Sequence, residues 1–196
     1  MVTKRNNSND YPVLSFEEPA EWEMWLEQNH SASNGVWLKF HKKASGLKSV
    51  NYNQALDVAL CFGWIDGQAT KFDENSYLQK FTPRRPKSIW SKRNIEHVAR
   101  LEKEGRMRLS GQKAVELAKA DGRWEMAYDS PAQMSIPEDF LGELAKNKKA
   151  YEFFESLNKA NKYAIAWRLQ TAKRPETRAK RMQTILEMMD RGERFH

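Results

Sequence analysis

The period at which apolar residues recur changes once along this chain, and that change restricts the fold more than any other feature of the sequence. Residues 36–41 alternate between apolar side chains and Trp, Lys and His, and residues 77–82 alternate in a similar way. Alternation with a period of two is typical of a strand that buries one face. After Pro83 and Pro86 the spacing of apolar residues becomes helical for the rest of the chain.

We therefore expect an α+β protein. Its N-terminal half should hold a small, mainly antiparallel sheet with flanking helices, and its C-terminal half should be helical. The α+β portion is expected over residues 11–90, and the helical portion over residues 91–196 is expected to pack on it within one continuous domain. A chain of 196 residues is long enough to bury a core of this size.

Several helix starts can be placed from capping residues. A helix over residues 19–29 begins with a proline in its first turn. Asn51 followed by Gln54 predicts a capping box at the start of a second helix. Ser91 and Ser110 are predicted to be the N-caps of the next two helices.

The single cysteine, Cys61, lies in an apolar run, so we expect a small core residue rather than a nucleophile. One cysteine cannot form an internal disulfide, and we expect a reducing, cytoplasmic compartment. The four histidines show no metal-binding spacing, so we expect neither a metal nor a cofactor. No window of the sequence approaches 18 apolar residues, and we expect no membrane span.

Positive charge is concentrated in two segments of a chain whose net charge is +7. Residues 80–108 hold ten Lys and Arg against three Glu, and residues 158–196 hold ten against four acidic residues. This segregation favours an anionic ligand or partner. A basic face that is merely solvated is the alternative.

The motif Arg84-Arg85-Pro86 stands between a predicted strand and a predicted helix. Guanidinium groups beside a helix N-terminus suit a phosphate or carboxylate, and nearby aromatic rings suit a flat one. Arg84 and Arg85 would hold the anion, while Trp64 or Trp90 would stack on it. The predicted ligand-binding residues are Trp64, Asp66, Tyr77, Arg84, Arg85, Trp90, Ser91 and Asn94.

Asp66 is the candidate catalytic residue, because it follows a strand start and precedes Gly67. As a base it could serve an enzyme that acts on a small phosphorylated or carboxylated compound. One carboxylate is not an acid/base pair, however, so the sequence leaves open whether the protein is an enzyme. A structural ion pair from Asp66 to Arg84 or Arg85 is the favoured alternative, and Asp66 could also orient the ligand.

The basic segments could also serve a macromolecular partner, either a nucleic acid or an acidic protein. Basic and aromatic residues interleave between Tyr77 and Arg93, but without a helix-turn-helix, an RNP-like strand or a zinc finger, nucleic-acid binding is not favoured. An acidic protein partner could instead use the basic residues of 173–196. An exposed apolar strip near residues 182–189 would support that interaction.

Several motifs together resemble the bacteriocin-protection, or YdeI/OmpD-associated, proteins of bacteria. The motifs are NYNQALDVALCFGWIDG, YLQKFTPRRPKSIWSKRN, GRM, DGRWEMAY and, nearer the C-terminus, AKRPETRAKRMQTILEMM. The resemblance covers nearly the whole chain from Tyr11 onward. It implies a role in tolerance of bacteriocins or of cationic antimicrobial stress, and the family's name also connects it with an outer-membrane porin. We therefore expect a cytosolic stress-protection protein that binds a small anion, phosphorylated or nucleotide-like.

Overall fold

The computed structural model describes residues 11–129 and 133–195, and these form two compact units. The N-terminal unit comprises residues 11–90 with 94–126, and the C-terminal unit comprises residues 91–93 with 127–195. Each unit has its own elements and its own core. The packing of the helical portion on the sheet portion stays a prediction.

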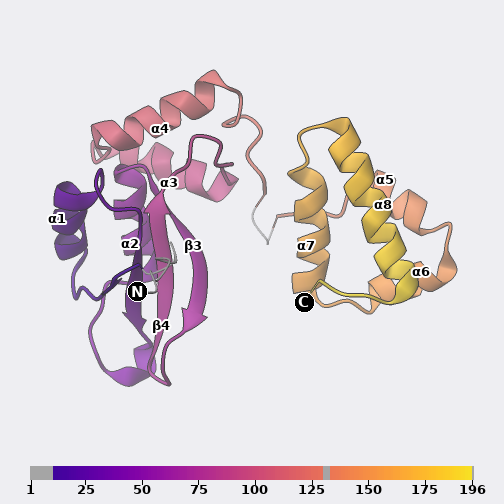
Figure 1. Cartoon of the computed structure of the whole chain (residues 1–196), viewed down its shortest axis with the longest axis horizontal. Helices are drawn as coiled ribbons and strands as arrows, with labels where there is room; N and C mark the ends of the chain where they lie inside the picture. Colours follow the sequence, from indigo (N-terminus) through magenta and orange to yellow (C-terminus); the bar gives the residue numbers. More distant parts are fainter. Residues whose placement is uncertain (1–10, 130–132, 196) are drawn as a thin grey trace, which may run out of the picture. The chain divides into compact units, whose positions relative to one another are not determined.

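A four-stranded sheet in the order β1-β2-β4-β3 organises the N-terminal unit (Figure 1). The short edge strand β1 pairs parallel to β2, and the other two pairings are antiparallel. The expectation of an α+β fold with a mainly antiparallel sheet is confirmed. The strands are β1 (Val13–Leu14), β2 (Val36–His41), β3 (Trp64–Lys71) and β4 (Ser76–Pro83).

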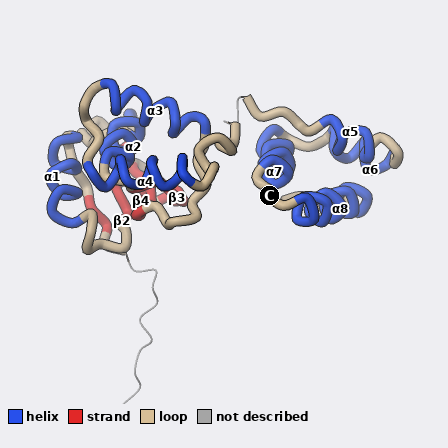
Figure 2. Tube along the Cα trace, turned by 90° about the horizontal axis from the view of Figure 1, so that it is seen from above, coloured by secondary structure: helices blue, strands red, loops and turns tan. Residues whose placement is uncertain are grey.

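Four α-helices accompany the sheet. In Figure 2, α2 and α3 lie on the same side of the strands. Asn51 caps α2 as predicted, because its side chain accepts from the Gln54 backbone while the Gln54 side chain accepts from the Asn51 backbone. The helices are α1 (Pro19–Asn29), α2 (Tyr52–Cys61), α3 (Lys92–Lys103) and α4 (Leu109–Ala120), with a short 3-10 turn, η1 (Lys43–Ser45), after β2.

The core of this unit forms where α1 and α2 meet the sheet. The indole nitrogen of Trp22 in α1 donates to the carbonyl of Ala55 in α2 at 3.1 Å. The Trp22 ring lies 5.9 Å from the ring of Phe81 in β4 and 6.2 Å from that of Trp64 in β3. The apolar positions of the alternating segments therefore point to the helices, as the period of two requires.

Helix α4 approaches the end of α2 closely at two glycines. Gly63 has φ +74°, a conformation that favours glycine, and a Cβ there would lie 2.9 Å from the Ser110 carbonyl oxygen. A Cβ on Gly111 would lie 2.8 Å from the carbonyl carbon of Cys61 and 2.9 Å from the Leu60 oxygen. The Arg108 amide donates to the Cys61 carbonyl at 3.0 Å, which fixes the crossing.

This crossing explains why the predicted start of α4 was wrong. The helix begins at Leu109 with Arg108 as its N-cap, so Ser110 lies inside the first turn. The hydrogen bond between the Arg108 amide and the end of α2 fixes where the chain enters α4. This tertiary contact outweighs the preference for serine at the N-cap position. Ser91 precedes α3, as expected, and pairs with Tyr128 in an isolated parallel bridge.

The C-terminal unit is helical, as the spacing of its apolar residues predicts. Its helices are α5 (Glu138–Leu144), α6 (Lys148–Glu155), α7 (Lys159–Gln170) and α8 (Pro175–Arg191) (Figure 1). Their core is built from the buried residues Phe140, Leu144, Ala150, Phe154, Leu157, Ile165, Leu169, Ile185 and Met189.

The apolar strip of α8 belongs to that core. Ile185 and Met189 are buried, and Met182 and Leu186 are half-buried against the same cluster. The apolar side chains of α8 therefore do not form the exposed strip that would have supported a protein partner at residues 173–196. Among the described helices, none combines the length and the apolar character that crossing a membrane demands.

Replacing Gly111 by alanine tests the close crossing of α2 and α4. The new Cβ would push against the backbone of Leu60 and Cys61, so we expect Gly111→Ala to lower the free energy of unfolding by about 1–3 kcal/mol. The matched control is Gly142→Ala in α5, where a Cβ meets nothing within 4 Å. It should be neutral or stabilise by up to about 1 kcal/mol, the helix propensity gain. Urea denaturation followed by circular dichroism measures both, and equal effects would contradict the crossing.

Candidate functional site

Arg84 is fixed directly after β4 by its backbone and by an aromatic ring. Its amide donates to the Gly63 carbonyl at 2.9 Å, which ties the end of β4 to the start of β3. Its guanidinium carbon lies 3.4 Å from the centre of the Trp90 ring, and Nη1 donates to the Ile89 carbonyl at 3.3 Å. The stacked, delocalised cation is therefore held in one orientation.

Trp90 is the ring on which the Arg84 guanidinium stacks. It is 2% exposed, and its ring meets Trp124 edge-on at 4.9 Å. A small cavity of about 100 Å³ beside it is lined in part by Arg84, Arg85 and Arg123. Arg123 is engaged elsewhere, since it donates to both carboxylate oxygens of Asp121 at 2.7 Å and to the Ser88 carbonyl at 2.8 Å.

A larger cavity of about 530 Å³ opens where β4 ends. Lys80, Arg84 and Arg85 all line it, and within residues 11–129 and 133–195 no acidic side chain is among its lining residues. The Lys80 ammonium lies 4.4 Å from the centre of the Tyr11 ring and 5.8 Å from that of Trp37. Three cations around one concave surface raise the local concentration of anions.

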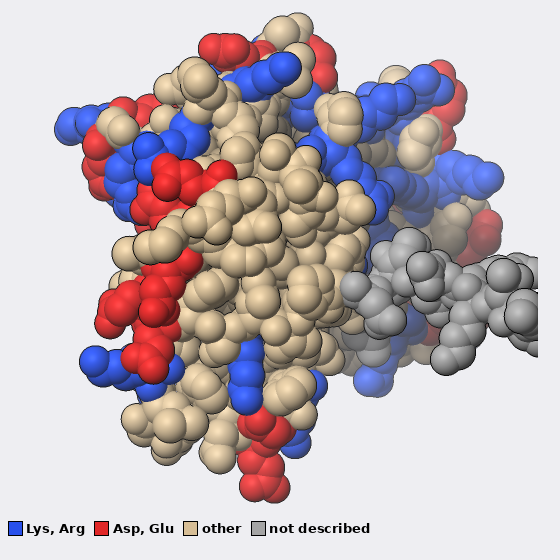
Figure 3. Space-filling view, turned by 60° about the vertical axis from the view of Figure 1, so that its left-hand side comes forward, with Lys and Arg blue, Asp and Glu red and all other residues tan. Residues whose placement is uncertain are grey.

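Charge is unevenly distributed over the molecule. Figure 3, seen from the side on which α1 lies in Figure 1, shows a face whose centre is uncharged and whose borders carry acidic and basic side chains. The acidic side chains that α1 contributes include Glu23, which meets Arg108 at 2.9 Å. Some arginines of the basic segment 80–108 are thus paired with carboxylates.

Trp64 and Asp66, which were predicted to join the site, face the helices instead. Trp64 is 1% exposed, and its indole nitrogen donates to the His30 carbonyl at 3.2 Å. Asp66 accepts a hydrogen bond from the Tyr52 hydroxyl at 2.8 Å. Among the described residues no ion pair joins Asp66 to Arg84 or Arg85, so the ion-pair alternative was wrong. The reason is that Asp66 lies opposite Phe81 in the sheet and points to α2.

The remaining predicted residues are spread along the chain. Tyr77 stacks on Phe40 at 5.2 Å near the far end of β4, about 23 Å along the strand from Arg84 at 3.3 Å per residue. Burial raises the pKa of Tyr77. Ser91 and Asn94 are both buried, at 9% and 8% exposure. Of the eight predicted residues, the structure brings Arg84, Arg85 and Trp90 together.

Lys80 is the residue that the sequence prediction missed. The sequence assigns Lys80 to a basic segment but not to a site. Along a strand, every second side chain points to the same face. The side chains of Lys80 and Thr82 therefore lie on one face of β4, near the end of the strand that Arg84 follows. Thr82 lines the same cavity. In residues 11–129 and 133–195, no group of three or more His, Cys, Asp or Glu could hold a metal ion.

Two family models match this chain. Residues 14–114 match one described as a domain of unknown function (DUF8412), and residues 133–192 match one described as bacteriocin-protection, YdeI or OmpD-associated. The second match confirms the expected resemblance over residues 133–192, whereas the motifs within residues 51–107 lie in the part of the chain that the first model matches. No curated protein and no solved structure matches significantly.

The thiol of Cys61 offers a test of its placement in the core. Cys61 is 2% exposed, and burial raises its pKa to about 11. At pH 8 only about one thiol in a thousand would be ionised, so we expect very slow reaction with Ellman's reagent in the native protein. The reaction should become fast in guanidinium chloride, which exposes the thiol. Fast labelling of the native protein would contradict a buried, protonated Cys61.

Proposed function

We propose that this chain is a stress-protection protein that binds a small anion through its N-terminal unit. The chain belongs to the DUF8412 family, and its residues 133–192 match the family described as bacteriocin-protection, YdeI or OmpD-associated. The single observation that carries the proposal is the cavity at the end of β4. Lys80, Arg84 and Arg85 line it, and none of the described residues that line it is acidic. Its volume of about 530 Å³ is typical of small-molecule sites.

The geometry favours a phosphorylated or nucleotide-like ligand. A phosphate can accept hydrogen bonds from the planar guanidinium groups in pairs, and the ammonium of Lys80 adds a point charge. Because Trp64 and Trp90 are almost fully buried, a ring on the ligand would use Tyr11, which lines the cavity. Asp66 is not among the lining residues, so the proposal is one of binding and not of base catalysis.

The physiological part of the proposal comes from the family description. A family described by bacteriocin protection supports a role in stress tolerance. We place the protein in the cytoplasm, where its one cysteine would stay reduced. In this proposal the N-terminal unit senses or holds the anion, and the family domain at residues 133–192 supplies the protective role.

Thermal-shift measurements on the full chain with adenosine monophosphate and pyrophosphate test the binding. A ligand at one hundred times its Kd stabilises the native state by about 2.7 kcal/mol, which raises Tm by several degrees. We expect Arg85→Ala and Lys80→Ala each to lose most of that rise, because each removes a cation from the cavity.

The matched control is Lys87→Ala. Lys87 is exposed in the same loop and does not line the cavity, yet its loss changes the net charge by the same amount. Its ligand-induced shift should therefore equal that of the wild type. Equal losses in Lys87→Ala and Arg85→Ala would reduce the effect to general electrostatics and contradict a site.

A further inference from the structure

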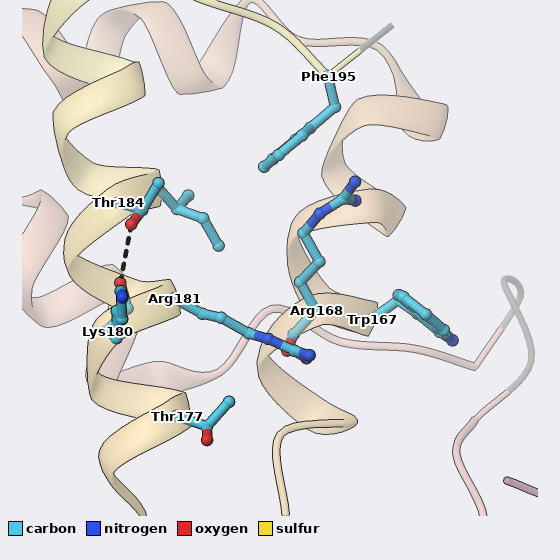
Figure 4. A pocket seen from close by; sticks show the side chains of 8 residues that line it. Trp167, Arg168, Thr177, Lys180, Arg181, Thr184 and Phe195 are labelled. Atoms are coloured by element: carbon cyan, nitrogen blue, oxygen red, sulfur yellow. Dashed lines mark hydrogen bonds between the residues drawn. The ribbon is translucent and has the colours of Figure 1, made fainter.

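A second basic cavity lies within the C-terminal unit, between α7 and α8. Its volume is about 410 Å³. Figure 4 shows Arg181 reaching from α8 across to α7, where Arg168 turns toward Phe195. The side chains that define the cavity include Trp167, Arg168, Lys180, Arg181, Thr184 and Phe195.

Arg168 is held in this cavity by neutral groups. Its guanidinium carbon lies 3.8 Å from the centre of the Phe195 ring, and Nη1 donates to the Ala164 carbonyl at 3.2 Å. The side chain is half-buried. Neither the ring nor the carbonyl carries a formal charge, so these contacts position the cation without neutralising it.

Arg181 is fixed at the C-terminal end of α7. Its Nη1 donates to the Arg168 carbonyl at 2.8 Å and to the Thr171 hydroxyl at 3.3 Å. Burial, and then the positive charge of Arg181, lowers the pKa of Arg168. Two arginines of facing helices thus line one cavity, and the charge of Arg181 disfavours the charge of Arg168.

Other arginines of the same helix have carboxylate partners. Arg178 donates to both carboxylate oxygens of Asp139, at 2.6 and 2.8 Å, and Arg191 pairs with Glu193 at 2.9 and 3.0 Å. Within the described residues, no carboxylate lies within 4 Å of Arg168 or Arg181. Of the arginines in α8, the one that has no carboxylate partner among the described residues is therefore Arg181, which lines the cavity.

We propose that this cavity binds a small organic anion, a carboxylate or phosphate attached to an aromatic or aliphatic group. Arg168, Arg181 and Lys180 would surround the anionic end, where a ligand charge replaces the missing counter-ion. Trp167, Ile185 and Phe195 give the cavity its apolar surface for the rest of the ligand. The site requires none of Lys80, Arg84 and Arg85 and is independent of the function proposed above.

Isothermal titration calorimetry of the full chain with phenyl phosphate and with inorganic phosphate tests this site. The phenyl group would bury apolar surface, so phenyl phosphate should bind at least about tenfold more tightly than inorganic phosphate. Arg168→Gln keeps a donor for the Ala164 carbonyl but removes the charge, and it should weaken binding by at least about tenfold. Lys180→Ala, at an exposed position, should weaken binding without any effect on folding.

Arg178→Ala is the matched control, since it removes an arginine from the same helix outside the cavity. It should leave the affinity for phenyl phosphate unchanged. An equal loss in Arg178→Ala and Arg168→Gln would overturn the proposal, and so would the absence of heat from both phosphates. Binding that Arg85→Ala abolishes but Arg168→Gln and Lys180→Ala do not would assign the ligand to the N-terminal unit and likewise overturn it.

Discussion

The indole of Trp22 is the contact on which the N-terminal unit depends. It donates a hydrogen bond to Ala55 in α2 and packs against Trp64 and Phe81 in the sheet, so one side chain joins two helices to two strands. Trp64 is thereby held in the core, directly after Gly63, whose carbonyl accepts from the Arg84 amide. The position of the candidate anion site therefore follows from how the core closes around Trp22.

The parts of the fold that depend on local chemistry could be predicted from the sequence. Alternation over residues 36–41 and 77–82 correctly indicated two strands, and Asn51 with Gln54 correctly indicated a capped helix. The start of α4 could not be predicted in this way. It depends on Arg108 meeting the end of α2, a tertiary contact that leaves no periodic signal in the sequence.

The candidate site was predictable only where its residues are close in sequence. Arg84 lies over the Trp90 ring, and Arg85 lines the same small cavity, because a short loop connects both arginines to Trp90. Trp64 was proposed to stack on a ligand because it carries a large ring, but strand direction points that ring into the core. Residues 158–196 were recognised as basic, yet the sequence cannot show which arginines find carboxylates, because Arg178 and Asp139 are 39 residues apart.

In the two proposed anion sites, Arg84 and Arg168 are held by similar contacts. Each guanidinium lies over an aromatic ring, Trp90 or Phe195, and each donates to a main-chain carbonyl. Such contacts remove rotational freedom, so less entropy would be lost if an anion bound as we propose. A carboxylate partner would fix the side chain equally well but would compete with the ligand. Arginines held by rings and carbonyls are therefore better indicators of an anion site than the local count of basic residues.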